Sequence, residues 1–132
     1  MILVDTSVLI DYLKGNSNTA QEKFDFILKK QIPYSIHYVI FQEVLQGAKN
    51  EREYALLTEY LETIPFLELL YGKESYAKAA YLSLRCRKQG VPVKSTIDFL
   101  IARLAIENKV PLLHNDMDFT RIAGVDDGLK CY

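Results

Sequence analysis

Residues 1–11 read Met-Ile-Leu-Val-Asp-Thr-Ser-Val-Leu-Ile-Asp, and this segment gives the clearest indication of the fold. The first four residues are wholly apolar, which is typical of a strand buried on both faces of a parallel sheet. After Asp5 the apolar residues recur with helical spacing, and Thr6 or Ser7 is expected to cap that helix. The opening therefore predicts a buried strand that leads directly into a helix.

The rest of the chain alternates helical segments with short apolar runs. Strands are expected near 32–36 and 110–113; 66–70 is either a strand or an extended connection, and 129–132 is a candidate for a last strand. Two helices are predicted to end at glycines, one at Gly15 and one after Gln46 at Gly47. Four more are predicted over 19–30, 51–63, 74–89 and 97–108, the last capped by Ser95 or Thr96, and a short helical turn is predicted at 119–123. This alternation favours an α/β fold with a parallel sheet. No repeat or linker interrupts residues 1–132, so we expect a single domain.

Composition narrows the class of protein. The 16 basic and 17 acidic side chains leave a formal net charge of −1, so bulk charge gives no argument for a nucleic-acid partner. The longest uncharged stretch, 31–42, is too short and too polar for a membrane span, and the N-terminus lacks the basic region of a signal peptide. Cys86 and Cys131 make neither a disulfide framework nor a zinc cluster. We expect a cytoplasmic protein with reduced thiols and no membrane partner.

Four acidic residues fall where a parallel α/β sheet forms its ligand crevice. Asp5 directly follows the first strand, and Asp116 lies three residues after Leu113, at the end of another. The carboxyl ends of parallel strands share one edge, so acids that are distant in sequence can meet there. Asp98 lies in the first turn of its helix, which can point at the same crevice, and Glu43 lies on a largely apolar helix.

Each acid alone also has a structural explanation. Asp5 can end a strand or cap a helix, and Asp98 complements a helix dipole. Asp116 and Asp118 can form a turn that caps the short helix after them. Glu43 is harder to explain, because acids seldom lie among apolar neighbours without a partner.

Together the four carboxylates predict a metal site. Brought within several ångströms they repel one another, and a divalent cation removes that cost. An all-oxygen ligand set favours Mg²⁺ or Mn²⁺ over Zn²⁺. Such a metal polarises a phosphate and lowers the pKa of a bound water, so the pattern suits phosphoryl transfer.

Four segments of the chain resemble the motifs of PIN-domain ribonucleases. The opening 1–11 is similar to the first motif and 35–47 (SIHYVIFQEVLQG) to the second. Residues 98–105 (DFLIARLA) and 112–119 (LLHNDMDF), followed by Ile122-Ala123, resemble the third and fourth in order and spacing. The length is that of the VapC toxins of VapBC toxin–antitoxin systems. The resemblance implies a PIN-like three-layer fold, with a central, mostly parallel sheet flanked by helices.

The resemblance also implies an activity and a set of site residues. The activity is that of a Mg²⁺- or Mn²⁺-dependent endoribonuclease that hydrolyses RNA phosphodiesters with a metal-activated water. By their positions in the motifs, four acids of this chain match the catalytic and metal-binding acids of the family. They are Asp5, Glu43, Asp98 and Asp116. Asp5 and Asp98 are the expected direct ligands. Thr6 and Asp118 match auxiliary positions, and His114 has a structural or substrate-orienting role.

The partners implied by the resemblance are those of a type II toxin. A cognate VapB-type antitoxin would block the metal crevice and would itself bind operator DNA. The substrate is RNA, with transfer and ribosomal RNA as possibilities, and a homodimer is expected. Two other classes were weighed: a catalytically inactive PIN-like interaction module, and a phosphoacceptor or phosphatase domain. Intact acids at all four motif positions argue against the first. Against the second, the opening Asp5-Thr6-Ser7-Val8 lacks the Asp-x-Asp of haloacid-dehalogenase phosphatases, and the late lysine of a response-regulator receiver has no clear counterpart.

Two further patterns have a structural and a functional interpretation. The first helices carry many apolar and aromatic side chains. We expect most of them to lie in the core, and the alternative is that they contact an antitoxin or a second copy of the chain. These residues are Tyr12, Leu13, Phe24, Phe26, Tyr38, Phe41 and Tyr54. The basic run 85–88 can contact an RNA backbone, although a solvated helix face is the favoured interpretation.

Overall fold

The first strand lies at the centre of the computed structural model, which describes residues 1–132. β1 (Ile2–Val4) is buried throughout and is the middle strand of a three-stranded sheet in the order β2-β1-β3. Its neighbours β2 (Tyr34–Ser35) and β3 (Leu112–Leu113) both run parallel to it. A strand with a neighbour at each edge and helices on both faces has no side turned to solvent, which explains its apolar sequence. The predicted parallel α/β architecture is confirmed.

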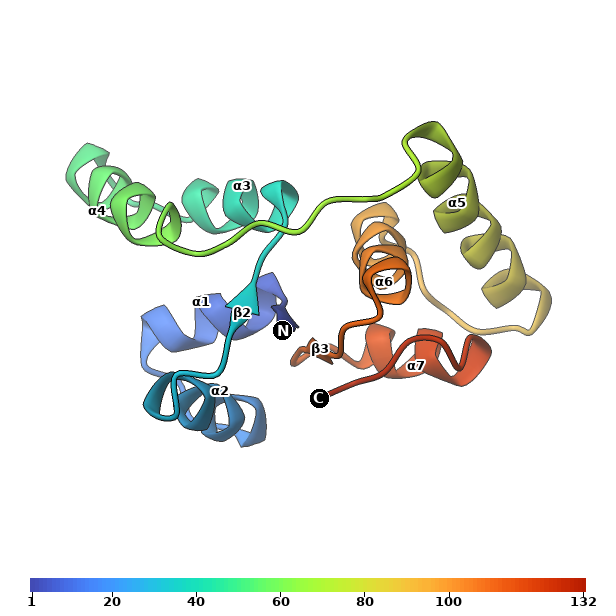
Figure 1. The fold of residues 1–132 in the computed structure, drawn as a ribbon, viewed down its shortest axis with the longest axis horizontal. Coiled ribbons are helices and arrows are strands. Elements are labelled where there is room, and N and C mark those ends of the chain that lie inside the picture. The colour runs from blue at the N-terminus through green and yellow to red at the C-terminus, as the bar shows by residue number, and fades with distance from the viewer.

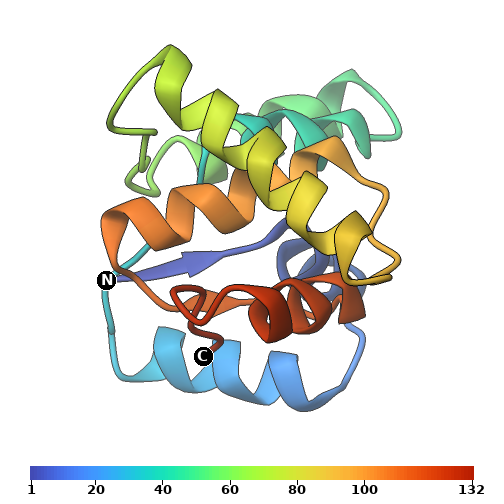
Figure 2. The ribbon, with the colours of Figure 1, turned by 90° about the vertical axis from the view of Figure 1, so that its right-hand side faces the viewer.

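Seven helices surround this small sheet. They are α1 (Thr6–Lys14), α2 (Thr19–Lys29), α3 (Tyr38–Gln46), α4 (Glu51–Leu61), α5 (Lys73–Lys88), α6 (Thr96–Asn108) and α7 (Met117–Val125). Figure 1 shows α1 to α4 on one side of the strands and α5 to α7 on the other. In Figure 2, β1 runs between α6 above and α2 below. The helices therefore flank the sheet on both sides, as the resemblance implied.

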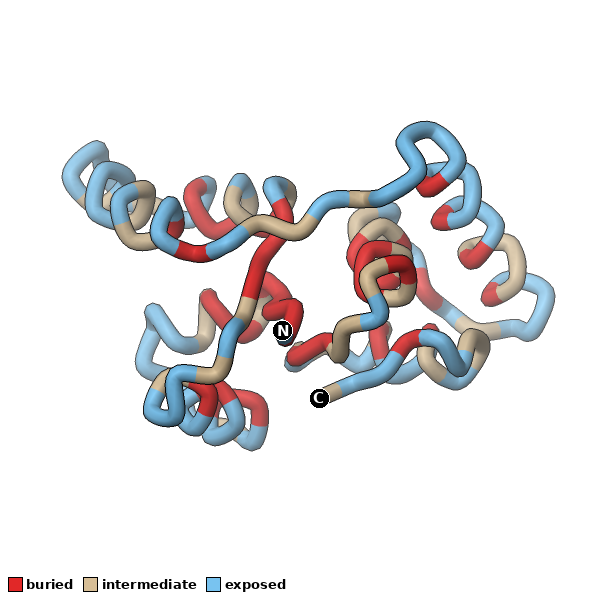
Figure 3. The backbone as a smooth tube through the Cα atoms, viewed as in Figure 1, coloured by how far each residue is buried: buried red, intermediate tan, exposed pale blue.

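One contiguous core joins the sheet to the helices. It contains 28 buried apolar residues, and Figure 3 shows them on the sides of the helices that face inward. Phe24 of α2 is among the largest fully buried side chains. Its ring makes edge-to-face contacts with Tyr12 and Tyr34, with centroid separations of 5.2 and 5.5 Å. The core thus surrounds β1 and receives side chains from the helices on both sides of the sheet.

The expectation that most of the aromatic and apolar load of the first helices lies in the core is wrong. Phe24 is fully buried and Phe41 is partly buried. The remaining five are exposed: Tyr12, Leu13, Phe26, Tyr38 and Tyr54. Each short helix buries one narrow stripe. On α2, Phe24 and Ile27 lie three residues apart and point inward, so Phe26 between them faces solvent.

The cap of α1 also differs from the prediction. Asp5, not Thr6 or Ser7, is the N-cap: its backbone is extended and its carboxylate accepts the Ser7 N–H. The strand ends at Val4 and the helix begins at Thr6, so Asp5 is the one residue between them that can cap the helix. Gly15 ends the helix as predicted, with a φ of 73° that suits glycine. Ser95 caps α6 as predicted.

The structure decides one open alternative and corrects the extents of two other short segments. Phe66 makes an isolated bridge to Ile36, so the segment around it is an extended connection. Cys131 makes a similar bridge to Leu112 and does not form a full strand. The last helix is longer than the predicted turn, because Asp116 caps it two residues earlier. No helix has the length and apolar character needed to cross a bilayer.

Candidate active site

The three parallel strands end at one edge of the sheet, and the acids gather there. Asp5 follows β1 directly, its backbone N–H donating to the carbonyl of Leu113 in β3. Asp116 lies beyond the end of β3 and caps α7. Asp98 comes to the same place from the first turn of α6. The topology thus assembles carboxylates that are far apart in sequence.

Asp98, Asp116 and Asp118 form the tightest cluster of acids. Each offers a carboxylate oxygen, and these oxygens all lie within 4.8 Å of one another. The set holds two of the predicted quartet together with Asp118, which the sequence pattern ranked as auxiliary. Burial, and after it the negative charges of Asp116, Asp5 and Asp118, together raise the pKa of Asp98 to about 7. The cluster is therefore held together against its own repulsion.

Asp5 lies beside this cluster and is more deeply buried, with 7% of its surface exposed. Its Oδ2 accepts the Ser7 hydroxyl at 2.6 Å and the Ser7 N–H at 3.1 Å. Burial raises the pKa of Asp5, the bonds from Ser7 oppose this effect, and nearby Glu43 adds to it. The carboxylate of Asp5 thus caps α1 and at the same time borders the acidic cluster.

Glu43 reaches the site from α3 through Thr6. The Thr6 hydroxyl donates to Glu43 Oε1 at 2.7 Å. This bond supplies the partner that an acid on a largely apolar helix requires. Glu43 does not belong to the three-carboxylate cluster, and its charge acts on Asp5. The predicted quartet is therefore arranged as Glu43 and Asp5 on one side and Asp98 with Asp116 on the other.

A network that sequence patterns did not reveal links the first strand-helix turn to the loop after β3. The Asn115 backbone N–H donates to Ser7 Oγ at 3.0 Å, and the same hydroxyl donates to Asp5. The Asn115 side chain donates to Asp11 Oδ2 at 2.9 Å. These bonds fix the backbone beside Asp116 relative to Asp5. Asn115 carried no signal in the sequence beyond its place in the fourth motif.

One basic side chain and one histidine border the acids. Arg121 pairs with Asp118 at 2.7 Å, so one carboxylate of the cluster already has a cationic neighbour. His114 Nδ1 accepts the Asp116 N–H at 3.2 Å, and Nε2 lies 3.3 Å from Cys131 Sγ. Burial lowers the pKa of His114. Its contacts fit the structural role expected of it.

The donor set at this edge fits a hard divalent cation. All candidate ligands are carboxylate oxygens, and no Cys or His belongs to the cluster. Crowding of like charges, reflected in the raised pKa of Asp98, is relieved when a cation binds. Of the basic run 85–88, Arg85 is engaged elsewhere, in an ion pair with Asp126 at 3.0 Å.

Comparison with known proteins agrees with this geometry. The chain is 29% identical over 126 residues to the VapC ribonuclease Mb1587 of Mycobacterium bovis and to the ribonuclease VapC11 of Mycobacterium tuberculosis. Each match covers 95% of this chain and 93% of the relative.

Solved structures share the fold at low sequence identity. VapBC2 of Rickettsia felis bound to promoter DNA has a TM-score of 0.72 at 16% identity, covering 100% of this chain and 98% of that one. DNA-bound VapBC of Salmonella typhimurium has a TM-score of 0.73 at 20% identity, covering 99% and 96%. The PIN domain profile matches residues 2–125. The chain belongs to the PIN domain family.

Proposed function

We propose that this chain is a metal-dependent endoribonuclease and the toxin of a type II toxin–antitoxin pair. The observation that carries the proposal is the convergence of Asp98, Asp116 and Asp118 within 4.8 Å at the strand ends, with Asp5 beside them. The names of its relatives, which are VapC ribonucleases, support the reaction and its substrate class. The family match over residues 2–125 supports the treatment of 1–132 as one PIN domain.

Mg²⁺, with Mn²⁺ as a substitute, is the proposed cofactor. The proposed metal-binding set is Asp5, Glu43, Asp98 and Asp116, of which Asp5 and Asp98 would be the direct ligands. When bound, such an ion polarises the scissile phosphate and lowers the pKa of a coordinated water. Mg²⁺ keeps several waters and takes few carboxylates directly, so Glu43 and Asp118 act at longer range. Thr6 holds Glu43 in place, and Arg121 holds Asp118.

The proposed reaction is hydrolysis of an RNA phosphodiester by water. No side-chain nucleophile is needed, so the products carry 5′-phosphate and 3′-hydroxyl ends and the RNA 2′-hydroxyl takes no part. The carboxylates of the site would hold the cation and accept the proton that water releases.

The direct test is cleavage of total RNA by the purified chain. Wild-type protein in Mg²⁺ or Mn²⁺ is expected to cleave, whereas Asp5→Asn and Asp98→Asn lose nearly all activity and remain folded. Asp25→Asn, at an exposed position on α2, serves as the matched control. Wild-type rates for Asp98→Asn would overturn the site assignment, and activity of the wild type in excess EDTA would overturn the metal requirement.

The proposed partner is a VapB-type antitoxin, which alone would contact operator DNA. The two structural relatives above are described as VapBC proteins bound to DNA, and this supports the pairing. We also propose a homodimer and a cytoplasmic location. A small reading frame next to the gene is expected to encode a protein that co-purifies with this chain and inhibits cleavage. Light scattering tests the dimer, and a strict monomer at micromolar concentration would refute it.

A further inference from the structure

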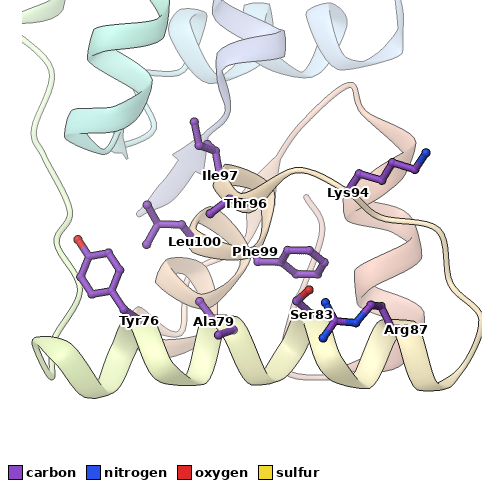
Figure 4. Close-up of a pocket in the computed structure, with 10 residues that line it drawn as sticks. Tyr76, Ala79, Ser83, Arg87, Lys94, Thr96, Ile97, Phe99 and Leu100 are labelled. Atoms are coloured by element: carbon purple, nitrogen blue, oxygen red, sulfur yellow. The ribbon is translucent and has the colours of Figure 1, made fainter.

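A groove separates α5 from the start of α6, next to the acidic edge (Figure 4). Its volume is about 440 Å³, within the range of small-ligand sites. One stripe of α5, running from Tyr76 at one end to Arg87 at the other, forms its first wall. The second wall is the turn that opens α6, together with Lys94 in the connection before it.

The charge of this groove is of one sign. Arg87 and Lys94 line it and no carboxylate does, whereas four other cavities of the protein each contain at least one acid. The ion pairs of the protein engage other cations: Lys78, Arg85, Arg103 and Arg121. Arg87 and Lys94 are therefore free to bind an external anion. In a chain with a net charge of −1, an acid-free groove with two free cations selects an anionic ligand.

The remaining lining suits a flat, apolar group attached to that anion. The Tyr76 side chain at the far end is 56% exposed. Ile97 and Leu100 contribute an apolar wall, with Phe99 buried behind it. Thr96 and Ile97 are the first two residues of α6, and backbone N–H groups at this position lack helical acceptors and favour anions. A nucleotide combines these properties, with a phosphate for the cations and a base for the aromatic ring.

The groove adjoins the proposed catalytic edge through α6. Asp98 follows Ile97 directly, so one helical turn contributes to both the groove and the acidic cluster. We propose that this groove is a subsite for single-stranded RNA, which holds a nucleotide next to the scissile phosphodiester. Arg87 and Lys94 contact its phosphates, and Tyr76 stacks on a base. This inference rests on the proposed ribonuclease function and assigns to the same site a way of holding its substrate strand.

Binding can be measured apart from cleavage. The probe is a fluorescein-labelled single-stranded oligoribonucleotide, titrated with protein in EDTA and followed by anisotropy at several KCl concentrations. The double variant Arg87→Gln/Lys94→Gln is expected to bind more weakly and to lower the slope of log affinity against log salt by about 1.4, since each phosphate contact on a single strand contributes about 0.7. Tyr76→Ala is expected to weaken binding about fivefold or more, the lower end for base–aromatic stacking.

Matched controls come from the same helix. Lys88→Gln removes an exposed cation outside the groove, and Tyr81→Ala removes a tyrosine that is 60% exposed and does not line it. Both are expected to bind RNA as the wild type does. All five altered positions are exposed, so unchanged thermal unfolding is expected and serves to verify the fold. Equal losses in the groove variants and their controls would overturn the proposal.

The cleavage assay separates this inference from the function on which it rests. In Mg²⁺ the groove variants are expected to raise KM and leave kcat unchanged, because they act on a nucleotide beside the reacting phosphate. If the wild type cleaves RNA and the groove variants match it in KM and affinity, the subsite is refuted and the ribonuclease stands. If the wild type cleaves no RNA, the proposed function fails. If Arg87→Gln/Lys94→Gln keeps RNA affinity and loses a co-purifying antitoxin, the groove is a protein-docking surface and the proposal is overturned.

Discussion

Replacing Asp98 by Asn is expected to stabilise the metal-free protein above neutral pH, although it removes a residue of the proposed metal site. Burial and then the charges of Asp116, Asp5 and Asp118 raise the pKa of Asp98 from 3.8 to about 7. Between these values the folded protein keeps a proton that the unfolded chain has released. The stability of the wild type therefore falls as the pH rises from about 4 to about 7, and it stays low above that range.

The size of the effect follows from that interval. About three pH units correspond to about 4 kcal/mol for a fully shielded group. Asp98 is only half-buried, so screening by solvent reduces this to about 2 kcal/mol. The Asn side chain carries no charge and keeps an N–H donor for Asp118, which accepts a hydrogen bond from protonated Asp98. At about 4 °C per kcal/mol, the variant is expected to unfold roughly 8 °C above the wild type at about pH 8.

Thermal unfolding followed by circular dichroism in EDTA measures this difference. The gap is expected to shrink to less than half at about pH 5, where the folded wild type is already protonated at Asp98. Asp25→Asn, the exposed control on α2, should show no gap at either pH. Adding Mg²⁺ should raise the melting temperature of the wild type and not that of Asp98→Asn. A variant that melts at or below the wild type at about pH 8 in EDTA would refute the reasoning.

Three further changes test the packing and the hydrogen bonds. Phe24→Ala should lower the free energy of unfolding by about 3–5 kcal/mol in a urea titration, because the ring is fully buried between two tyrosines. Glu107→Gln should lower the free energy of unfolding by about 3 kcal/mol in the same assay, because the buried carboxylate of Glu107 accepts three hydrogen bonds, one of them from an arginine. The control Glu74→Gln, which alters an exposed ion pair, should lower it by less than about 1 kcal/mol. Thr6→Val removes the 2.7 Å bond to Glu43 and should cost about 1.5–3 kcal/mol; a loss within experimental error would show that this bond contributes nothing.

The position of the acids was predictable because it depends on topology. An apolar run that ends in Asp5 and another that ends near Asp116 indicate strands, and parallel strands share one carboxyl edge. Ser95 two residues before Ile97 predicted a helix start, which placed Asp98 at the beginning of α6. Each step uses only local patterns and one general rule of α/β folds. The family motifs then indicated which acids belong together.

The contacts within the site were not predictable in the same way. Asn115 acts through its backbone N–H on Ser7 and through its side chain on Asp11. Both partners lie more than a hundred residues away in sequence, so no local pattern reports them. Asp118 ranked as auxiliary in the motif, yet its carboxylate is in the tightest cluster. The distances among Asp98, Asp116 and Asp118 depend on how α6 and α7 pack, which tertiary contacts decide.

The net charge of −1 is the sum of two regions with opposite requirements. Without the predicted quartet, 13 of the 17 acidic residues remain against 16 basic ones, which leaves a mildly basic remainder. In the structure, acidic and basic side chains are separated locally. Carboxylates lie close together at the strand ends, and the adjoining groove contains Arg87 and Lys94 without an acid. A metal-dependent nuclease must attract a cation and a polyanion to adjacent points. Evenly mixed charges would weaken both attractions, so the proposed binding of RNA depends on the spatial separation of charge and not on its total.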